Sequence, residues 1–313
     1  MVVSDASKDS NSTPPQIPFL ARLTGGLAWH YTNTSGLLGI FDSGRLWASS
    51  LQSLNDMSEG KHGLEVVRRA WGTIKNAPLP EGFFDCISNA LDEEAMAEVR
   101  KSVFLISAST HPDSLNQWMH YSGSDGFAIG LGLDAVWRPV QKFGATQPPP
   151  LFGTHLREGW YEVIYDQSAQ DQLAEDVLKW LADNWRTLPD TKSSTNKEAG
   201  VASARHIINS IVFLLKHPAF SDEREVRYVC AISEKEAHAV SYRAVGNRVV
   251  SYLPVACIPE VAPLGQPLGL QIDAVKCGPG ISLKDVEIIR DRVQRTANYP
   301  VVTQSEIPLR PRA

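Results

Sequence analysis

The sequence has 313 residues, of which 43% are hydrophobic, and it carries 30 lysines and arginines against 35 aspartates and glutamates. A chain of this length and hydrophobicity can bury one large core, so we expect a globular protein. Its net charge of −5 argues against a broad basic surface of the kind that binds duplex nucleic acid without sequence preference.

Neither a membrane segment nor a secretion signal is predicted. The sequence has no run of about 18 apolar residues, the length that spans a bilayer. Its first residues are rich in Ser, Asp and Pro, whereas a signal peptide has a basic start and an apolar middle. The cysteines lie far apart, which favours reduced, buried thiols over a metal site or a disulfide framework. We therefore expect a cytoplasmic protein without a membrane partner.

One α+β domain over residues 23–313 is predicted, preceded by a disordered arm over residues 1–22. Ser, Asn, Pro and charged residues in the arm bury too little apolar surface to offset the entropy of ordering. The domain is expected to contain two helical insertions, at about residues 60–100 and 169–217, among segments with the strand pattern.

The first elements are predicted from residues 27–50. Residues 27–32, LAWHYT, alternate in the period-two pattern of a strand with one apolar face, so His30 points away from its aromatic neighbours. Ser35 is then expected to cap a short helix that Gly44 ends, before a second strand in RLWASS. Further strands are expected in the segments 102–109, 126–133, 159–166, 223–232, 248–255 and 299–307.

Two clusters in the first 65 residues suit a binding site. A neutral histidine at position 30, with Thr32 on the same face, can exchange hydrogen bonds with a sugar hydroxyl, although it can equally be satisfied by the backbone. Residues 54–63 gather Asn55, Asp56, Glu59 and His62, whose oxygens suit a hard cation. The alternative for this cluster is a helix start, with Asp56 as N-cap and Glu59 as its capping-box partner.

The segment that follows the predicted strand at 102–109 contains a possible aromatic pocket wall. Ser107 and Ser109 end that apolar strand, and Trp118 and Tyr121 are three residues apart on an expected helical turn. Aromatic residues at this spacing can enclose a flat ring, or they can belong to the core.

A charged stretch, EREVR, begins the strand predicted at residues 223–232. On a strand, Glu223, Glu225 and Arg227 share one face. Two carboxylates beside a guanidinium suit either the stabilisation of a cationic transition state or a charge ladder on the surface.

Taken in order, these segments resemble an uncharacterised bacterial family known as domain of unknown function 2971. The resemblance covers most of the chain from about residue 27 and supplies no activity by itself. It rests on the segments WHYTNTSGLLGIFDSGRLWASSLQSLNDMSE, ISASTHPDSLNQWMHYSGSDGFAIGL, KHPAFSDEREVRY and VKCGPGI.

A looser resemblance, to the ADP-ribosyltransferase fold, implies an activity. WHYT with its short helix and SGRLWASS is similar to the opening of those folds, where a first-strand histidine in an HGT-like motif holds the ribose of NAD. ISAST resembles their serine-containing strand, and EREVR resembles their E-x-E strand, whose second glutamate is catalytic. The resemblance implies a split, mostly antiparallel sheet with flanking helices, NAD as co-substrate and no metal. One departure is that Tyr31, rather than glycine, follows His30.

The roles that this resemblance implies fall on eight residues. Glu225 would stabilise positive charge on the ribose, supported by Ser107, and Glu223 would orient or deprotonate the acceptor. His30 and Thr32 would hold the adenosine-side ribose. Tyr121, or otherwise Tyr31, would stack on nicotinamide, and Arg227 would either bind the diphosphate or keep Glu225 ionised.

Three functional hypotheses follow. The first is an NAD-dependent ADP-ribosyltransferase of a bacterial toxin or phage-defence kind, acting on a protein, nucleic acid or small molecule. The second is a metal-dependent hydrolase or nuclease that uses Asp56, Glu59, Glu223 and Glu225. The third is a nucleotide-binding module without turnover. The transferase hypothesis requires His30 and Glu225 to face the same cleft.

Overall fold

The computed structural model describes residue 18 and residues 20–51, 57–92, 101–123, 125–140, 159–186, 197–232, 234–258, 271–295 and 300–308. Most of the predicted arm, and residues 93–100 of the first predicted insertion, lie outside the described residues. Leu20 packs on a helical core and Leu23 pairs with Trp160, which anchors the start of the described chain. Within the described ranges, no helix has the length and apolar character needed to cross a membrane.

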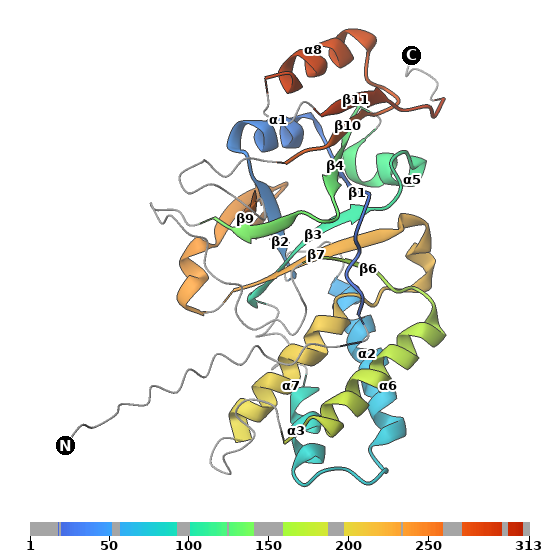
Figure 1. Ribbon diagram of the computed structural model, residues 1–313, viewed down its shortest axis with the longest axis vertical. Coiled ribbons are helices and arrows are strands. Elements are labelled where there is room, and N and C mark those ends of the chain that lie inside the picture. The colour runs from blue at the N-terminus through green and yellow to red at the C-terminus, as the bar shows by residue number, and fades with distance from the viewer. Residues whose placement is uncertain are drawn as a thin grey trace, which may run out of the picture.

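An open, mostly antiparallel sheet flanked by helices forms the fold, as predicted (Figure 1). The strands are β1 (Leu27–Thr32), β2 (Leu46–Ser50), β3 (Val103–Ser109), β4 (Phe127–Gly132), β5 (Val136–Pro139), β6 (Trp160–Glu162), β7 (Glu225–Ala231), β8 (Ser241–Val245), β9 (Arg248–Ile258), β10 (Ala274–Cys277) and β11 (Val301–Gln304). Their order is β11-β10-β4-β1-β3-β2-β9-β5, with β7 also on β3, β6 on β7 and β8 on β9. Of these pairs, β10 and β11 are parallel.

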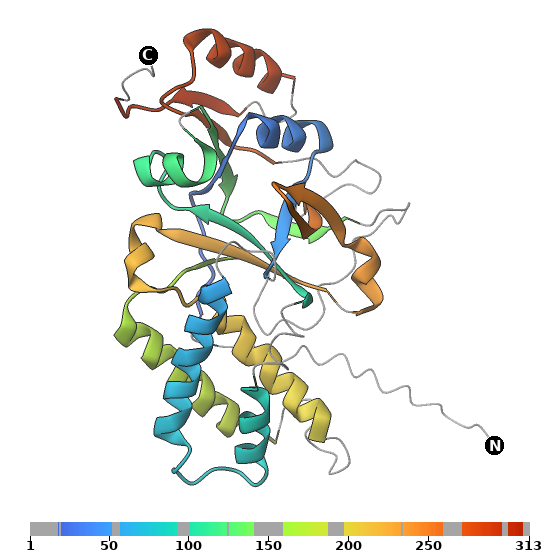
Figure 2. The same ribbon diagram turned by 180° about the vertical axis from the view of Figure 1, so that it is seen from behind.

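Helices cover both sides of the sheet. The α-helices are α1 (Thr34–Ser43), α2 (Met57–Ile74), α3 (Phe83–Ala90), α5 (Leu115–Gln117), α6 (Gln167–Asp183), α7 (Lys197–Val212) and α8 (Leu283–Val293). Shorter turns are the π-helix η2 (Trp118–Ser122) and the 3-10 helices η3 (Pro218–Glu223) and η4 (Glu234–Ala239). Figure 1 shows α2, α3, α6 and α7 gathered below the sheet and α1 and α8 above it, and Figure 2 shows the same layers from behind.

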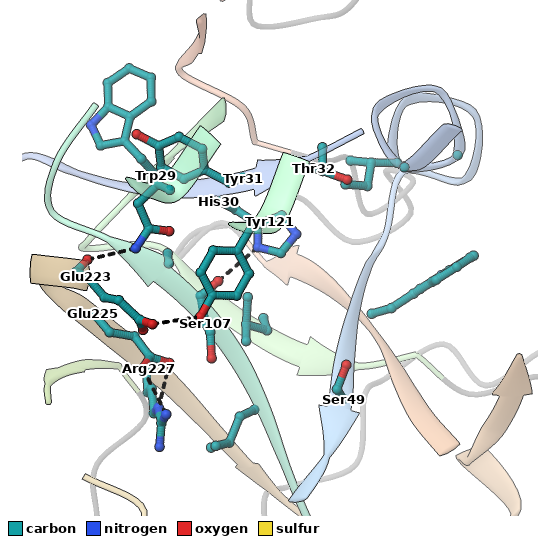
Figure 3. Close-up of a pocket in the computed structure, with 18 of the residues that line it drawn as sticks. Trp29, His30, Tyr31, Thr32, Ser49, Ser107, Tyr121, Glu223, Glu225 and Arg227 are labelled. Carbon is teal, nitrogen blue, oxygen red and sulfur yellow. Dashed lines mark hydrogen bonds and ion pairs between the residues drawn. The ribbon is translucent and has the colours of Figure 1, made fainter. Parts of the chain in front are cut away.

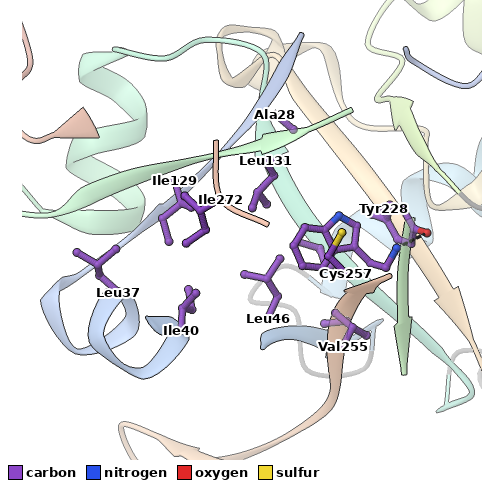
Figure 4. Packing of buried hydrophobic residues seen from close by; sticks show 14 of the residues in the cluster. Ala28, Leu37, Ile40, Leu46, Ile129, Leu131, Tyr228, Val255, Cys257 and Ile272 are labelled. Carbon is purple, nitrogen blue, oxygen red and sulfur yellow. Dashed lines mark hydrogen bonds between the residues drawn. The ribbon is translucent and has the colours of Figure 1, made fainter. Parts of the chain in front are cut away.

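The alternation of side chains along β3 explains this layering. Val103 and Leu105 belong to the core formed with α2, α3, α6 and α7, whereas Phe104 and Ile106 belong to the core on the other face. That second core packs Leu37 and Ile40 of α1 among buried strand residues (Figure 4). A strand buried on both faces fixes the position of its neighbours on both edges.

The edges of β3 create an opening in the sheet. One edge pairs with β7 along the whole strand, from Val103 to Ser109. On the other edge, β1 pairs at Ser109, whereas β2 pairs at Phe104 and Leu105. The two neighbours therefore diverge around Ile106 and Ser107, and this is where the candidate site lies.

The first strand and helix differ from the prediction at one position. β1 has the predicted bounds, and Gly44 ends α1 with a positive φ of 63°. The N-cap of α1 is Asn33 rather than Ser35, because the extended backbone of Asn33 lets its side chain accept a hydrogen bond from Gly36 N at 2.8 Å.

We predict that Gly63→Ala destabilises the protein, because α2 packs closely against the end of α7 at this glycine. A Cβ at position 63 would lie 2.4 Å from the backbone oxygen of Val212. We expect the free energy of unfolding to fall by about 1–3 kcal/mol in chemical denaturation.

Gly72→Ala is the matched control for this substitution, since it lies on the same helix and its Cβ would meet no atom within 4 Å. There the better helix propensity of alanine should stabilise by up to about 1 kcal/mol. Equal effects of the two substitutions would contradict the close packing of α2 on α7.

Candidate functional site

A cavity of about 330 Å³ lies between β1, β2, β3, α1 and the start of β7. All eight residues implied by the resemblance line it, and Figure 3 shows them around one space. These residues are His30, Tyr31, Thr32, Ser107, Tyr121, Glu223, Glu225 and Arg227. His30 and Glu225 therefore meet the requirement that they face the same cleft.

His30 compensates the divergence of the sheet at Ser107. Its Nδ1 lies 2.9 Å from the backbone oxygen of Ser107. An oxygen can only accept, so Nδ1 carries the proton and Nε2 is left as an acceptor. Burial lowers the pKa of His30 and is the largest cause. The hydrogen bond to Ser107 raises this pKa by less, and the charge of Arg243 lowers it further. The imidazole is therefore neutral at pH 7.

Two carboxylates and two cations form a buried cluster at the start of β7. Lys216 Nζ lies 2.6 Å from Glu223 Oε2 and 3.0 Å from Glu225 Oε2. Arg227 holds Glu225 with two bonds, Nε to Oε1 at 2.7 Å and Nη2 to Oε2 at 2.8 Å, and donates to the Phe213 oxygen from Nη1. We call Lys216, Glu223, Glu225 and Arg227 the ion cluster.

The ion cluster keeps Glu225 ionised. Burial opposes ionisation of this carboxyl, but the charge and hydrogen bonds of Arg227, the charge of Lys216 and a hydrogen bond from Ser107 outweigh it and lower its pKa to about 2. Glu223, Glu225 and Arg227 are only 8%, 6% and 2% exposed. The alternative of a surface charge ladder is therefore wrong.

Glu223 reaches the cavity by a different route from the predicted one. It ends η3 instead of lying on β7, because Arg224 adopts a left-handed conformation, with φ 44°, that turns the chain between the two glutamates. The Glu223 backbone oxygen accepts bonds from Ser109 Oγ and Gln117 Nε2, which hold this turn in place.

The two predicted aromatic wall residues separate in the structure. Trp118 and Tyr121 lie on the π-turn η2, where Trp118 is fully buried and donates from Nε1 to Asp113 at 2.7 Å. Tyr121 is 51% exposed, lines the cavity and donates to Glu223 Oε1 at 3.1 Å. Burial, and then the charge of Glu223, raises the pKa of Tyr121, so its phenol stays protonated. Trp118 is core, and only Tyr121 remains a wall residue.

Tyr31 is fixed by a loop rather than available for stacking. Its hydroxyl donates to the His111 oxygen at 2.8 Å and accepts from Ser114 N at 3.1 Å, and its ring packs edge-on against Trp118. The structure therefore favours Tyr121 over Tyr31 as the stacking residue, because the buried Tyr31 ring already packs on Trp118.

Of the cluster predicted at residues 54–63, only the His62 side chain lies among the described residues. Asn55, Asp56 and the side chain of Glu59 lie outside the described residues. His62 contacts Gln170 Oε1 at 3.0 Å, and its ring lies edge-on to that of His217. Among the described residues, no three His, Cys, Asp or Glu side chains are grouped to hold a metal ion.

Several lining residues were missed by the sequence analysis, above all Lys216 and Arg243. Lys216 follows the apolar residues 211–215. A single charged residue directly after such a stretch was the one sequence feature that could have indicated a buried, functional lysine. Arg243 lies in β8, whose local pattern gives no indication of a cavity.

We predict that Lys216→Met destabilises the protein strongly, because it leaves two neighbouring carboxylates buried without their shared cation. A loss of about 3–5 kcal/mol in the free energy of unfolding is typical of breaking a buried ion pair. The control is Lys179→Met, which removes an exposed pair with Glu175 and should have little effect on stability. Similar losses for both variants in urea denaturation would contradict the buried cluster.

We also predict an acid-dependent contribution from Glu225. Its folded pKa of about 2 lies below the ordinary value of 4.5, so its stabilisation is complete above pH 4.5 and is lost as the pH falls towards 2. In Glu225→Gln, the free energy of unfolding should therefore fall less steeply over this window than in the wild type. Parallel curves, measured by urea denaturation at successive pH values, would show that Glu225 has an ordinary pKa.

Comparison with known proteins gives one match. Residues 117–228 match the family model described as "Protein of unknown function (DUF2971)", in agreement with the first resemblance. The matched segment contains Tyr121 and the whole ion cluster but neither His30 nor Ser107. No curated protein and no solved structure matches the chain. The similarity to a family of unknown function thus covers the part of the chain that carries the ion cluster.

Proposed function

We propose that this chain is an NAD-dependent ADP-ribosyltransferase. The observation that carries the proposal is the convergence of His30 from β1, Ser107 from β3 and Glu225 from β7 on one cavity. Ser107 links the other two, because its backbone oxygen contacts His30 and its side chain helps to lower the pKa of Glu225. Three adjacent strands thus offer a neutral hydrogen-bonding imidazole and an ionised carboxylate to one ligand.

The charge states of these residues fit the chemistry of NAD. NAD supplies a glycosidic bond between nicotinamide and ribose, and both electrons of that bond leave with nicotinamide. Positive charge then develops on the ribose, and the Glu225 carboxylate, buried and ionised, is suited to stabilise it. His30 Nε2 can accept a hydrogen bond from a ribose hydroxyl, with Thr32 beside it on the cavity wall.

Tyr121 is suited to bind the planar nicotinamide ring. Its own ring lines the cavity and is half exposed, while its hydroxyl is tied to Glu223. Phe220, also partly exposed, lines the same cavity. A flat ring between such side chains gains offset stacking of about 0.5–1.5 kcal/mol beyond its buried area.

Glu223 is the group we assign to the acceptor. It stands next to Glu225 in the cavity, bonded to Tyr121 and Lys216. An acceptor hydroxyl, amine or carboxyl that replaces nicotinamide on the ribose must be held in place, and it must give up its proton where it carries one. Glu223 is positioned to orient that group and to take the proton.

Arg227 serves as a positioning residue in this proposal. Two of its nitrogens bind Glu225 and a third binds the Phe213 oxygen, so the guanidinium is committed to holding the carboxylate. These hydrogen bonds favour a role of Arg227 in fixing and ionising Glu225 over a role in binding a diphosphate.

The other two hypotheses have less support. A metal shared by Glu223 and Glu225 would compete with Lys216, whose ammonium already lies within 3.0 Å of both carboxylates. A nucleotide-binding module without turnover would use the same cavity, and it is separated from a transferase only by measuring product. The proposed setting is a cytoplasmic effector of a bacterial toxin or phage-defence kind.

The proposal is tested by nicotinamide release from NAD by the purified chain, together with transfer of label to candidate acceptors. We expect Glu225→Gln to reduce release by about 100-fold or more, since it removes the charge that stabilises the transition state. A chelator should leave release unchanged. Glu287→Gln removes the same charge from the exposed face of α8 and serves as the control.

Glu225→Gln removes a carboxylate that pairs with Lys216 and Arg227, so this variant can lose activity simply by unfolding. A second variant therefore tests the site without removing a buried charge. Tyr121→Ala removes a half-exposed ring, so the fold should persist while the KM for NAD rises. NAD binding without release by the folded wild type would favour the non-catalytic module. Release that depends on a metal would favour the hydrolase hypothesis.

A further inference from the structure

The cavity has a second charged side, formed by Arg243 of β8. Arg243 lines the cavity together with Ser49 and Trp47 of β2, on which β9 and β8 are assembled in turn. Figure 3 shows Ser49 across the drawn pocket from Glu225 and Arg227. The charge of Arg243 also helps to lower the pKa of His30, which lines the same cavity.

Aromatic rings hold the Arg243 side chain. Its guanidinium carbon lies 5.1 Å from the ring centre of Trp47 and 5.8 Å from that of Tyr252, and these two rings are themselves 4.7 Å apart. Nη2 reaches Ser49 Oγ at 3.4 Å. Stacking fixes the plane of a guanidinium while leaving its edges free to donate hydrogen bonds.

Arg243 differs from the other cations of the cavity in what it binds. Lys216 and Arg227 are bonded to carboxylates, whereas no carboxylate among the described residues pairs with Arg243. Its Nε is buried and has no hydrogen-bond partner there. A buried donor without a partner is unfavourable, so a ligand oxygen that reached Nε would remove that cost.

The balance of charge around the cavity points the same way. Among the residues that the structure describes, its lining contains three cations, Lys216, Arg227 and Arg243, against the carboxylates Glu223 and Glu225. With His30 neutral, these described residues carry an excess positive charge, although the whole chain carries −5. Because the ion cluster is compensated internally, the excess charge is on Arg243.

We propose that Arg243 binds the phosphate groups of a nucleotide in this cavity, with Ser49 beside it. A guanidinium offers paired donors that match two oxygens of a phosphate, and Nε with Nη2 forms such an edge. The neighbouring His30 Nε2 is an acceptor suited to a sugar hydroxyl, which favours a phosphorylated nucleoside over a simple carboxylate. The inference deepens the proposed function, in which these phosphates are the diphosphate of NAD.

The test measures binding of ADP-ribose, of inorganic pyrophosphate and of adenosine by calorimetry at low salt. We expect Arg243→Gln to weaken ADP-ribose binding by about 10- to 100-fold, the range of a charge-assisted hydrogen bond, and to abolish competition by pyrophosphate. Adenosine, which has no phosphate, should bind equally to the variant and the wild type.

Two further variants control for folding and for charge. Arg248→Gln removes the same charge from an exposed position at the start of β9, the other strand of the hairpin, and should change none of the affinities. Arg243→Lys keeps the charge but loses the planar fork and should give an intermediate loss. Unchanged ADP-ribose affinity in a folded Arg243→Gln variant would overturn the inference, as would wild-type protein that binds neither ADP-ribose nor pyrophosphate.

The outcomes separate this inference from the proposed function. ADP-ribose binding that depends on Arg243, in a wild type that releases no nicotinamide, would support the phosphate site while rejecting the transferase. Nicotinamide release with an unchanged KM for NAD in Arg243→Gln would support the transferase while rejecting the phosphate site.

Discussion

The mutual compensation of four buried charges is the constraint on which the rest of the site depends. Glu223, Glu225, Lys216 and Arg227 are almost removed from water, and each is tolerated only because the others are in place. Compensation requires the end of α7, the turn η3 and the start of β7 to meet at hydrogen-bonding distance. The ion cluster therefore fixes the junction between the helical layer and the sheet as well as one wall of the cavity.

The rest of the cavity forms where backbone groups of β3 are left unpaired by the neighbouring strands. β1 and β2 pair with different ends of β3, so the sheet cannot satisfy the middle of that edge. The Ser107 oxygen turns instead to His30 Nδ1, which fixes the tautomer and leaves Nε2 as an acceptor. The imidazole that satisfies the backbone is thus also the one that faces the cavity. The two alternatives considered for His30, a backbone partner and a ligand-binding group, are compatible.

Patterns within short segments of the sequence predicted the elements that form from neighbouring residues. The alternation in residues 27–32 predicted β1 with its bounds, and the E-x-E spacing led to the carboxylate of β7. Contacts between distant segments left no such pattern. Arg224 adopts a positive φ without being glycine, so nothing in the sequence separated Glu223 from the strand. Arg243 meets Ser49, which lies 194 residues earlier, and Tyr31 is held by a loop about 80 residues away.

The two sides of the cavity differ in how freely their charges can respond to a ligand. The carboxylates are held by the cations of the ion cluster, so they keep their positions and their charge when a ligand enters, and no reorganisation is required of them. Arg243 is held by aromatic rings, which fix its plane but leave its charge uncompensated by a carboxylate among the described residues. A ligand gains most when its anionic part meets Arg243 and its developing positive charge meets Glu225. Under the proposed function, such a ligand would bind in one orientation, with the bond to be broken on the carboxylate side of the cavity.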